Sequence, residues 1–233
     1  MTKAIYQLNF LGRDYQFTYS YLLYFLAFFP MKITIICGSQ RINSESLRIS
    51  QYIQELISQK VDVHLLDLAA SDFPRLHSFQ ATNDESWRLR WADTSQELAD
   101  SDGFIIVSPE WNGGATPTVK NFFLLCSNFE LCHKPALIVT TSSGHGGANV
   151  VTELRGFTYK NTNINYIPEH IIIRDCASIC RDHTILATDS KADIYIKKRL
   201  IFATDLLINY STCLKPLRAK SIPQFELSPF GMS

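Results

Sequence analysis

Short apolar runs that alternate with helix-patterned segments constrain the fold more than any other feature of this sequence. The segments "KITIICG" (32–38) and "GFIIVSP" (103–109) are continuous apolar runs, which are typical of strands buried on both faces of a sheet. Further strands are predicted at 61–66, 135–142 and 164–173, and helices at 46–59, 86–100, 118–129 and 192–211. This alternation predicts an α/β domain with a mostly parallel sheet and helices on both faces. Pro168 indicates that the last strand is an edge strand or is broken.

Charge and cysteine content exclude several classes of protein. The chain has 233 residues, enough for one domain with a sizeable core. Its 22 basic and 22 acidic residues give no net charge, so we expect no nucleic-acid or anionic-membrane partner. The six cysteines lack the spacing of a zinc site, and three lie in apolar runs. We therefore expect buried free thiols in a reducing cytoplasm.

The first thirty residues differ from the rest of the chain. The run "YQFTYSYLLYFLAFFP" (15–30) is apolar and aromatic, but polar residues interrupt it and it is shorter than the about 20 apolar residues of a membrane span. No small-residue cleavage site follows, as a signal peptide would require. We expect three segments: an extension upstream of the functional start (1–30), the domain (31–214) and a tail (215–233). The alternative for the first segment is a membrane anchor at 15–29.

Three loops rich in Gly, Ser, Asn or Pro follow predicted strands, at 38–46, 108–117 and 142–148. Ligands of doubly wound α/β proteins bind beyond the carboxyl ends of the strands, where the winding direction reverses. The three loops are therefore the predicted ligand site.

The first loop, "GSQRINSES", precedes a predicted helix. A helix start exposes unpaired N–H groups with a partial positive charge, which favours a phosphate. The hydroxyls of Ser39, Ser44 and Ser46 and the guanidinium of Arg41 can add hydrogen bonds and charge. The alternative is that Ser44 caps the helix and that Arg41 is a solvated surface residue.

The second and third loops offer groups that suit a flat polar ring. In "SPEWNGGATPTVKN" (108–121), Gly113 and Gly114 allow close approach of the backbone, and Glu110, Trp111 and Asn112 bring a carboxylate, an aromatic plane and an amide. An isoalloxazine has a matching shape, although a surface turn with Trp111 as a packing residue is the alternative. The third loop, "SSGHGG" (142–147), adds backbone donors that would stabilise the negative charge of a reduced flavin.

Together, "GSQRINSESL", "ADSDGFIIVSPEWNGGATPTVKN" and "TTSSGHGGA" resemble the NADPH-dependent FMN reductase family, whose pattern in the middle motif is Pro-Glu-Tyr-Asn-Gly, then Pro, then Lys-Asn. The resemblance covers about residues 31–175. It implies a flavodoxin-like, doubly wound, five-stranded parallel sheet, FMN as cofactor, NADPH or NADH as donor, and a homodimer or homotetramer. The cofactor-binding residues that it implies are Ser39, Arg41, Ser44, Ser46, Leu47, Pro109, Glu110, Trp111, Asn112, Gly113, Ser143, Gly144 and Gly146.

Four residues, at three places in the chain, depart from the family pattern. Trp111 replaces the usual Tyr, Ser46 stands where Asn is common, and Leu124-Leu125 replaces an Asp-Trp pair. The first two changes affect the predicted FMN site, and the third affects local packing and the expected contacts between subunits.

These features predict an FMN-dependent NAD(P)H oxidoreductase that passes electrons to a quinone, an azo compound, a metal oxyanion or a flavin. No side chain is predicted to act as a catalytic nucleophile, because the reactive atoms belong to the cofactor. Two alternatives remain: an FMN-binding electron carrier or redox-responsive module without nicotinamide turnover, and an α/β module that has lost the cofactor.

Overall fold

The computed structural model describes residues 5–10, 13–18, 31–73 and 86–220, and the chain divides into two units, residues 1–31 and 32–233. In the first unit, strand β1 (Ile5–Phe10) pairs antiparallel with β2 (Arg13–Thr18). Residues 19–30, which include most of the alternative membrane anchor at 15–29, lie outside the described residues. Within the described part of the chain, no helix has the length and apolarity that a membrane crossing requires.

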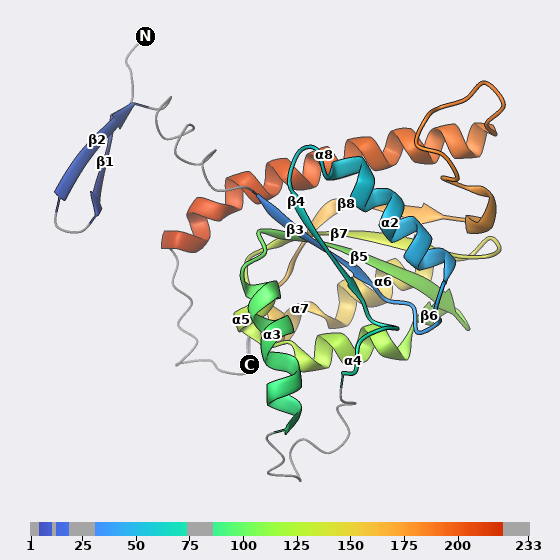
Figure 1. Cartoon of the computed structure of the whole chain (residues 1–233), viewed down its shortest axis with the longest axis horizontal. Helices are drawn as coiled ribbons and strands as arrows, with labels where there is room; N and C mark the ends of the chain where they lie inside the picture. Colours follow the sequence, from blue (N-terminus) through green and yellow to red (C-terminus); the bar gives the residue numbers. More distant parts are fainter. Residues whose placement is uncertain (1–4, 11–12, 19–30, 74–85, 221–233) are drawn as a thin grey trace. The chain divides into compact units, whose positions relative to one another are not determined.

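The second unit contains the predicted parallel sheet, in the order β4-β3-β5-β7-β8 (Figure 1). The short strand β6 (Gly114–Ala115) pairs antiparallel with the end of β5 and adds a sixth strand. The prediction of a doubly wound five-stranded parallel sheet is confirmed. The bounds of the parallel strands are β3 (Lys32–Cys37), β4 (Asp62–Asp67), β5 (Gly103–Trp111), β7 (Pro135–Thr141) and β8 (Asn165–Ile173).

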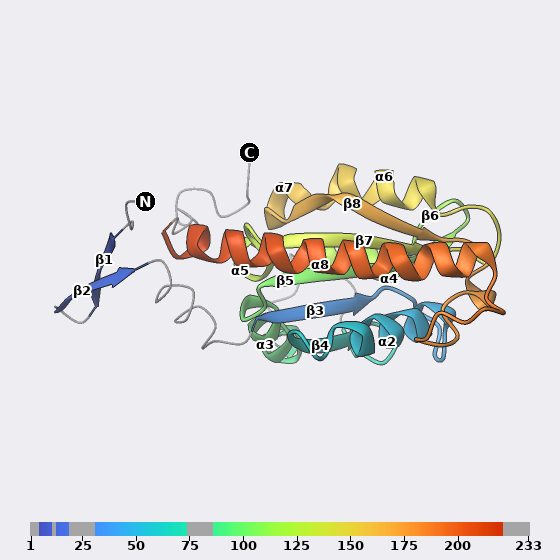
Figure 2. The same cartoon turned by 90° about the horizontal axis from the view of Figure 1, so that it is seen from above.

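Helices cover both faces of the sheet, as Figures 1 and 2 show. One face carries α2 (Glu45–Ile57) and α8 (Lys191–Lys220). The other carries α3 (Ser86–Ala99), α4 (Pro117–Leu125), α5 (Asn128–Leu131), α6 (Ala148–Phe157) and α7 (Tyr159–Thr162). The apolar faces of α3, α4 and α6 pack on β5 and β7 in one buried cluster around Phe104, Phe122 and Ile138.

The sequence predicted some helix boundaries wrongly. The helix expected at 118–129 is two helices, because Cys126 is extended and Ser127 starts α5 with a capping box to Glu130. The helix expected at 192–211 continues to Lys220, so the first residues of the predicted tail are helical, while 221–233 lie outside the described residues. Helix α6 was not predicted.

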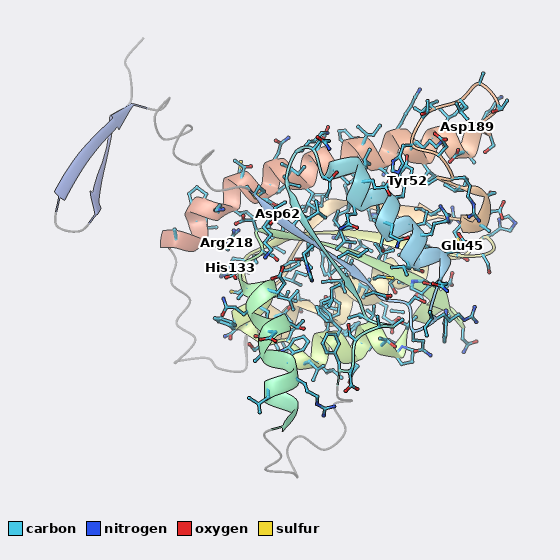
Figure 3. The ribbon with its side chains drawn as sticks, in the orientation of Figure 1. Glu45, Tyr52, Asp62, His133, Asp189 and Arg218 are labelled. Atoms are coloured by element: carbon cyan, nitrogen blue, oxygen red, sulfur yellow. The ribbon has the colours of Figure 1, made fainter. Side chains whose placement is uncertain are left out.

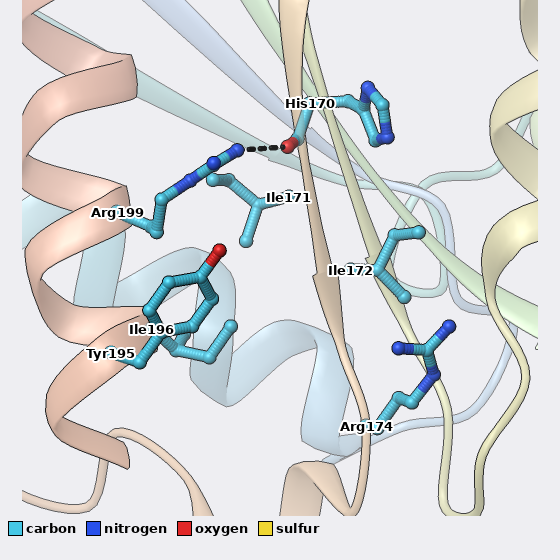
Figure 4. Close-up of a pocket in the computed structure, with 7 residues that line it drawn as sticks. All are labelled: His170, Ile171, Ile172, Arg174, Tyr195, Ile196 and Arg199. Carbon is cyan, nitrogen blue, oxygen red and sulfur yellow. Dashed lines mark hydrogen bonds between the residues drawn. The ribbon is translucent and has the colours of Figure 1, made fainter. Parts of the chain in front are cut away.

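Strand β8 is an edge strand of the sheet, as Pro168 indicated. Its pairing with β7 is irregular near this proline, between Ala136 and Ile138. Arg199 of α8 donates to the backbone carbonyl of His170 beside a cavity of about 210 Å³ between β8 and α8 (Figure 4). Arg174 follows β8 and leads toward the third predicted loop.

Candidate functional site

The first loop begins with a tight contact between β3, β5 and α4. The Gly38 N–H donates to the Val107 carbonyl at 2.7 Å, and the Thr116 hydroxyl donates to the Gly38 carbonyl at 2.5 Å. A Cβ on Gly38 would overlap the side chain of Val119. The close approach therefore fixes where the loop leaves the sheet.

The loop ends at the first turn of α2, as expected for a phosphate site. Ser44 is the N-cap residue, and its hydroxyl accepts from the Leu47 N–H at 3.1 Å. Ser39 is buried, and its hydroxyl accepts from the Arg41 N–H. Ser46 is also buried, and its hydroxyl lies 2.8 Å from that of Thr141 at the end of β7. The structure thus places Ser39 and Ser46 in the walls of the loop.

Arg41 is exposed and joins the first loop to the second. Its guanidinium carbon lies 4.7 Å from the centre of the Trp111 ring. This contact gives Trp111 a defined partner at the rim of the site.

The second loop is a β-hairpin rather than an irregular turn. Trp111 of β5 pairs with Gly114 of β6, and the two residues between them, Asn112 and Gly113, have φ angles of 49° and 78°. Positive φ at both central residues is typical of a type I′ turn, for which Asn-Gly is the preferred sequence. The hairpin exposes Asn112 and Gly113 at the carboxyl edge of the sheet.

Glu110 connects the second loop to the third. Its carboxylate accepts from the Gly147 N–H at the start of α6. A Cβ on Gly146 would overlap the same carboxylate, so this bond depends on a glycine there. Ser143 and Gly144, the other predicted residues of the third loop, are exposed.

Helix α6 holds the hairpin through side chains that sequence analysis missed. Asn149 donates to the Gly113 carbonyl, and Glu153 accepts from the Ala115 N–H at 2.6 Å. Glu153 also pairs with Lys120 of α4 at 2.5 Å. Burial alone would raise the pKa of Glu153, but the Lys120 hydrogen bond and the Ala115 N–H outweigh it and lower the pKa. In the sequence, Asn149 and Glu153 are marked only as polar residues of a helix, and this helix was not predicted because it directly follows the glycine-rich loop.

Three contacts therefore unite the predicted loops: Arg41 with Trp111, Glu110 with Gly147, and Ser46 with Thr141. Pro109 is buried near the end of β5 and contributes to the base of the same edge. The loops form one continuous rim at the carboxyl end of the sheet, where the winding direction reverses between β3 and β5.

Comparison with known proteins agrees with this geometry. The model of the NADPH-dependent FMN reductase family matches residues 31–177, which include all three loops. The chain belongs to this family. As a member of the NADPH-dependent FMN reductases, it is an oxidoreductase with FMN as cofactor and a reduced nicotinamide as electron donor.

Individual relatives are distant. An NADPH azoreductase of Bacillus sp. strain OY1-2 is 24% identical over 61% of this chain and 76% of its own length. An FMN-dependent NADPH-azoreductase of Staphylococcus saprophyticus is 27% identical over 54% of this chain and 68% of its own. The NAD(P)H:(acceptor) oxidoreductase FerB of Paracoccus denitrificans shares the fold, with a TM-score of 0.59 at 20% identity over 79% of this chain and 98% of its own.

The residues at the rim fit FMN. The first-turn N–H groups of α2 and the exposed guanidinium of Arg41 are the donors that a phosphate requires. The exposed backbone of Asn112–Gly113 and of 143–145 offers the N–H and C=O groups that the polar edge of an isoalloxazine needs. The buried Thr140 hydroxyl, beneath Gly147, has no hydrogen-bond partner and adds a free polar atom at this edge.

Proposed function

We propose that this FMN reductase passes electrons from a reduced nicotinamide to a small acceptor: a quinone, an azo compound, a metal oxyanion or a free flavin. The observation that carries the proposal is the link between Glu110 and the Gly147 N–H, which joins the second and third loops into one edge. The azoreductase names of two relatives support an aromatic acceptor.

We assign the phosphate of FMN to the first loop. Arg41 would supply charge, the first turn of α2 would supply N–H groups near Leu47, and Ser39, Ser44 and Ser46 would shape the wall. Because Ser44 already caps Leu47 and Ser46 already contacts Thr141, Arg41 is the side chain with the most freedom to meet a phosphate.

We assign the flavin ring to the second and third loops. FMN, when bound, would supply the hydride chemistry. Pro109, Glu110 and Trp111 would hold the hairpin, and the backbone of Asn112–Gly113 would face the ring. The backbone N–H groups of Ser143, Gly144 and Gly146 would stabilise negative charge on the reduced ring, as an oxyanion hole does. We assign no catalytic acid or base to the chain.

Further proposals concern assembly and location. We infer a homodimer or homotetramer in the cytoplasm, with residues 31–214 as the FMN-binding domain and residues 1–30 as an extension. The exposed Leu124 of α4 supports a contact between subunits, since a large apolar side chain there favours burial.

Spectroscopy of the purified protein tests the proposed function. We expect the protein to be yellow, or to take up added FMN, and we expect NADPH to bleach the bound flavin within a stopped-flow record. A quinone or an azo dye should then restore the flavin absorbance. A protein that takes up no FMN contradicts the proposal, and bound FMN that NADPH does not bleach would favour an electron carrier.

A further inference from the structure

The connection between β8 and α8, residues 174–190, is long for two adjacent elements and contains one 3-10 turn, Cys176–Ser178. Its first part is bound to the third loop. The Asp175 N–H donates to the Gly144 carbonyl at 3.2 Å, and the Cys176 N–H donates to the Ser142 carbonyl at 3.1 Å. Arg174 donates through Nε to the His145 carbonyl at 2.6 Å.

Arg48 binds the middle of this connection to α2. Its guanidinium donates to the carbonyls of Cys176, Ile179 and Cys180 at 2.7 to 2.9 Å. The same guanidinium pairs through Nε with Glu45 at 2.6 Å. The connection thus spans from the third loop to the helix whose first turn we assign to the phosphate.

Glu45 and Arg181 meet where the connection reaches the first turn of α2. Glu45 is the first residue of the helix, at the end that faces the site (Figure 3). Arg181 pairs with it at 3.1 Å and donates through Nε to the Ala177 carbonyl at 2.6 Å. The Arg181 side chain is 53% exposed, so the outer part of its guanidinium remains open to solvent.

A carboxylate at this position creates an electrostatic conflict. Glu45 stabilises the helix because a negative charge suits the N-terminus, but the same charge repels a phosphate bound there. Burial favours a raised pKa for Glu45, yet its hydrogen bond to Arg48 and the charges of Arg48 and Arg181 outweigh burial and lower the pKa. Glu45 is therefore ionised and its charge must be offset before a phosphate can bind well.

We propose that Arg181 determines affinity for the FMN phosphate, because it offsets Glu45 and adds a cation beside the first turn of α2. Arg48 is committed to three carbonyls and holds the connection in place, whereas Arg181 retains donors that can turn to an anion. This inference rests on the proposed function and adds a residue from outside the three loops to the site.

Riboflavin and FMN together test the inference, since riboflavin has the same ring and lacks the phosphate. The dissociation constants of both are measured at low salt by flavin fluorescence for wild type, R181Q, R181K, E45Q and the double variant E45Q/R181Q. We expect R181Q to weaken FMN binding about three- to fivefold, R181K to stay near wild type, and E45Q to tighten FMN binding by a similar factor. The double variant should return toward wild type, and riboflavin binding should not change in any of them.

The control is R90Q, which removes an arginine of similar exposure on α3 that pairs with Asp72. It should change neither dissociation constant. Equal weakening of FMN and riboflavin binding in R181Q would overturn the inference. If the wild type binds FMN well, an FMN dissociation constant that is the same in R181Q would also overturn it. A wild type that binds neither flavin contradicts the proposed function itself. Circular dichroism on each variant confirms that the fold is intact.

Discussion

The two ends of the sheet use similar polar residues in opposite ways. At the amino end of the strands, Asp102, Glu130 and Lys134 are all buried. Lys134 donates to the backbone carbonyls of Leu98, Ala99 and Glu130. Asp102 pairs with Lys215 at 2.8 Å and with Arg218 at 2.7 Å, and so fixes the last turns of α8. The hydrogen-bonding groups of these side chains are paired with other groups inside the fold.

At the carboxyl end, the polar groups link loops and keep part of their capacity exposed. Arg41 contacts the face of Trp111 with its donors open to solvent, and Glu110 binds one N–H of the third loop. Polar groups whose donors stay accessible indicate a ligand site, whereas polar groups that are buried and paired indicate a role in stability.

Asp102→Ala should give the largest effect and should act only on stability. It leaves the Lys32 N–H without its acceptor and two cations of α8 without their carboxylate. We expect the free energy of unfolding to fall by about 3 kcal/mol in urea titrations, with the FMN dissociation constant unchanged. The control is Asp205→Asn, which breaks the exposed pair with Lys60 and should cost less than about 1 kcal/mol. Equal losses in the two variants would contradict the distinction between the ends.

Gly146→Ala should produce the complementary result at the carboxyl end. The new Cβ would displace the Glu110 carboxylate and break its bond to the Gly147 N–H. We expect the FMN dissociation constant to rise about tenfold, while the loss of one hydrogen bond lowers the free energy of unfolding by about 1 kcal/mol. Gly156→Ala, in open space on α6, is the matched control and should leave FMN binding unchanged. A Gly146→Ala variant that binds FMN normally would show that this link is structural.

Lys134 should make the stability of the fold depend on pH. Burial and the charge of Arg218 lower the pKa of Lys134 to about 7 from an ordinary value of 10.5. Between these values the unfolded chain holds a proton that the folded chain has released, so the free energy of unfolding should rise with pH. Urea titrations at pH 6.5 and 9 should show this rise in wild type relative to Lys134→Met, a comparison in which other titrating groups cancel. Parallel pH profiles would contradict it.

The parallel sheet and the positions of the three loops could be predicted from the sequence alone. Continuous apolar runs such as 103–109 identify strands that are buried on both faces, and the order of elements then dictates which loops share an edge. The Asn112-Gly113 pair is also a strong sequence signal for a β-hairpin, a turn that the prediction of a cofactor loop did not include.

Other features depend on contacts between distant segments. Nothing near Glu110 in the sequence indicates that it binds Gly147, and the role of Arg48 depends on carbonyls about 130 residues away. Such backbone acceptors have no residue signature, because every residue carries a carbonyl. The connection 174–190 is polar without periodicity, so only its contacts reveal that it belongs to the site edge.

Hydrogen exchange with and without FMN tests the central claim most directly, that three loops form one cofactor site. We expect FMN to slow exchange in segments 38–47, 108–115 and 142–147 together, and to leave the amino end around Asp102 unchanged. Protection confined to one loop, or found away from the carboxyl edge, would contradict the account.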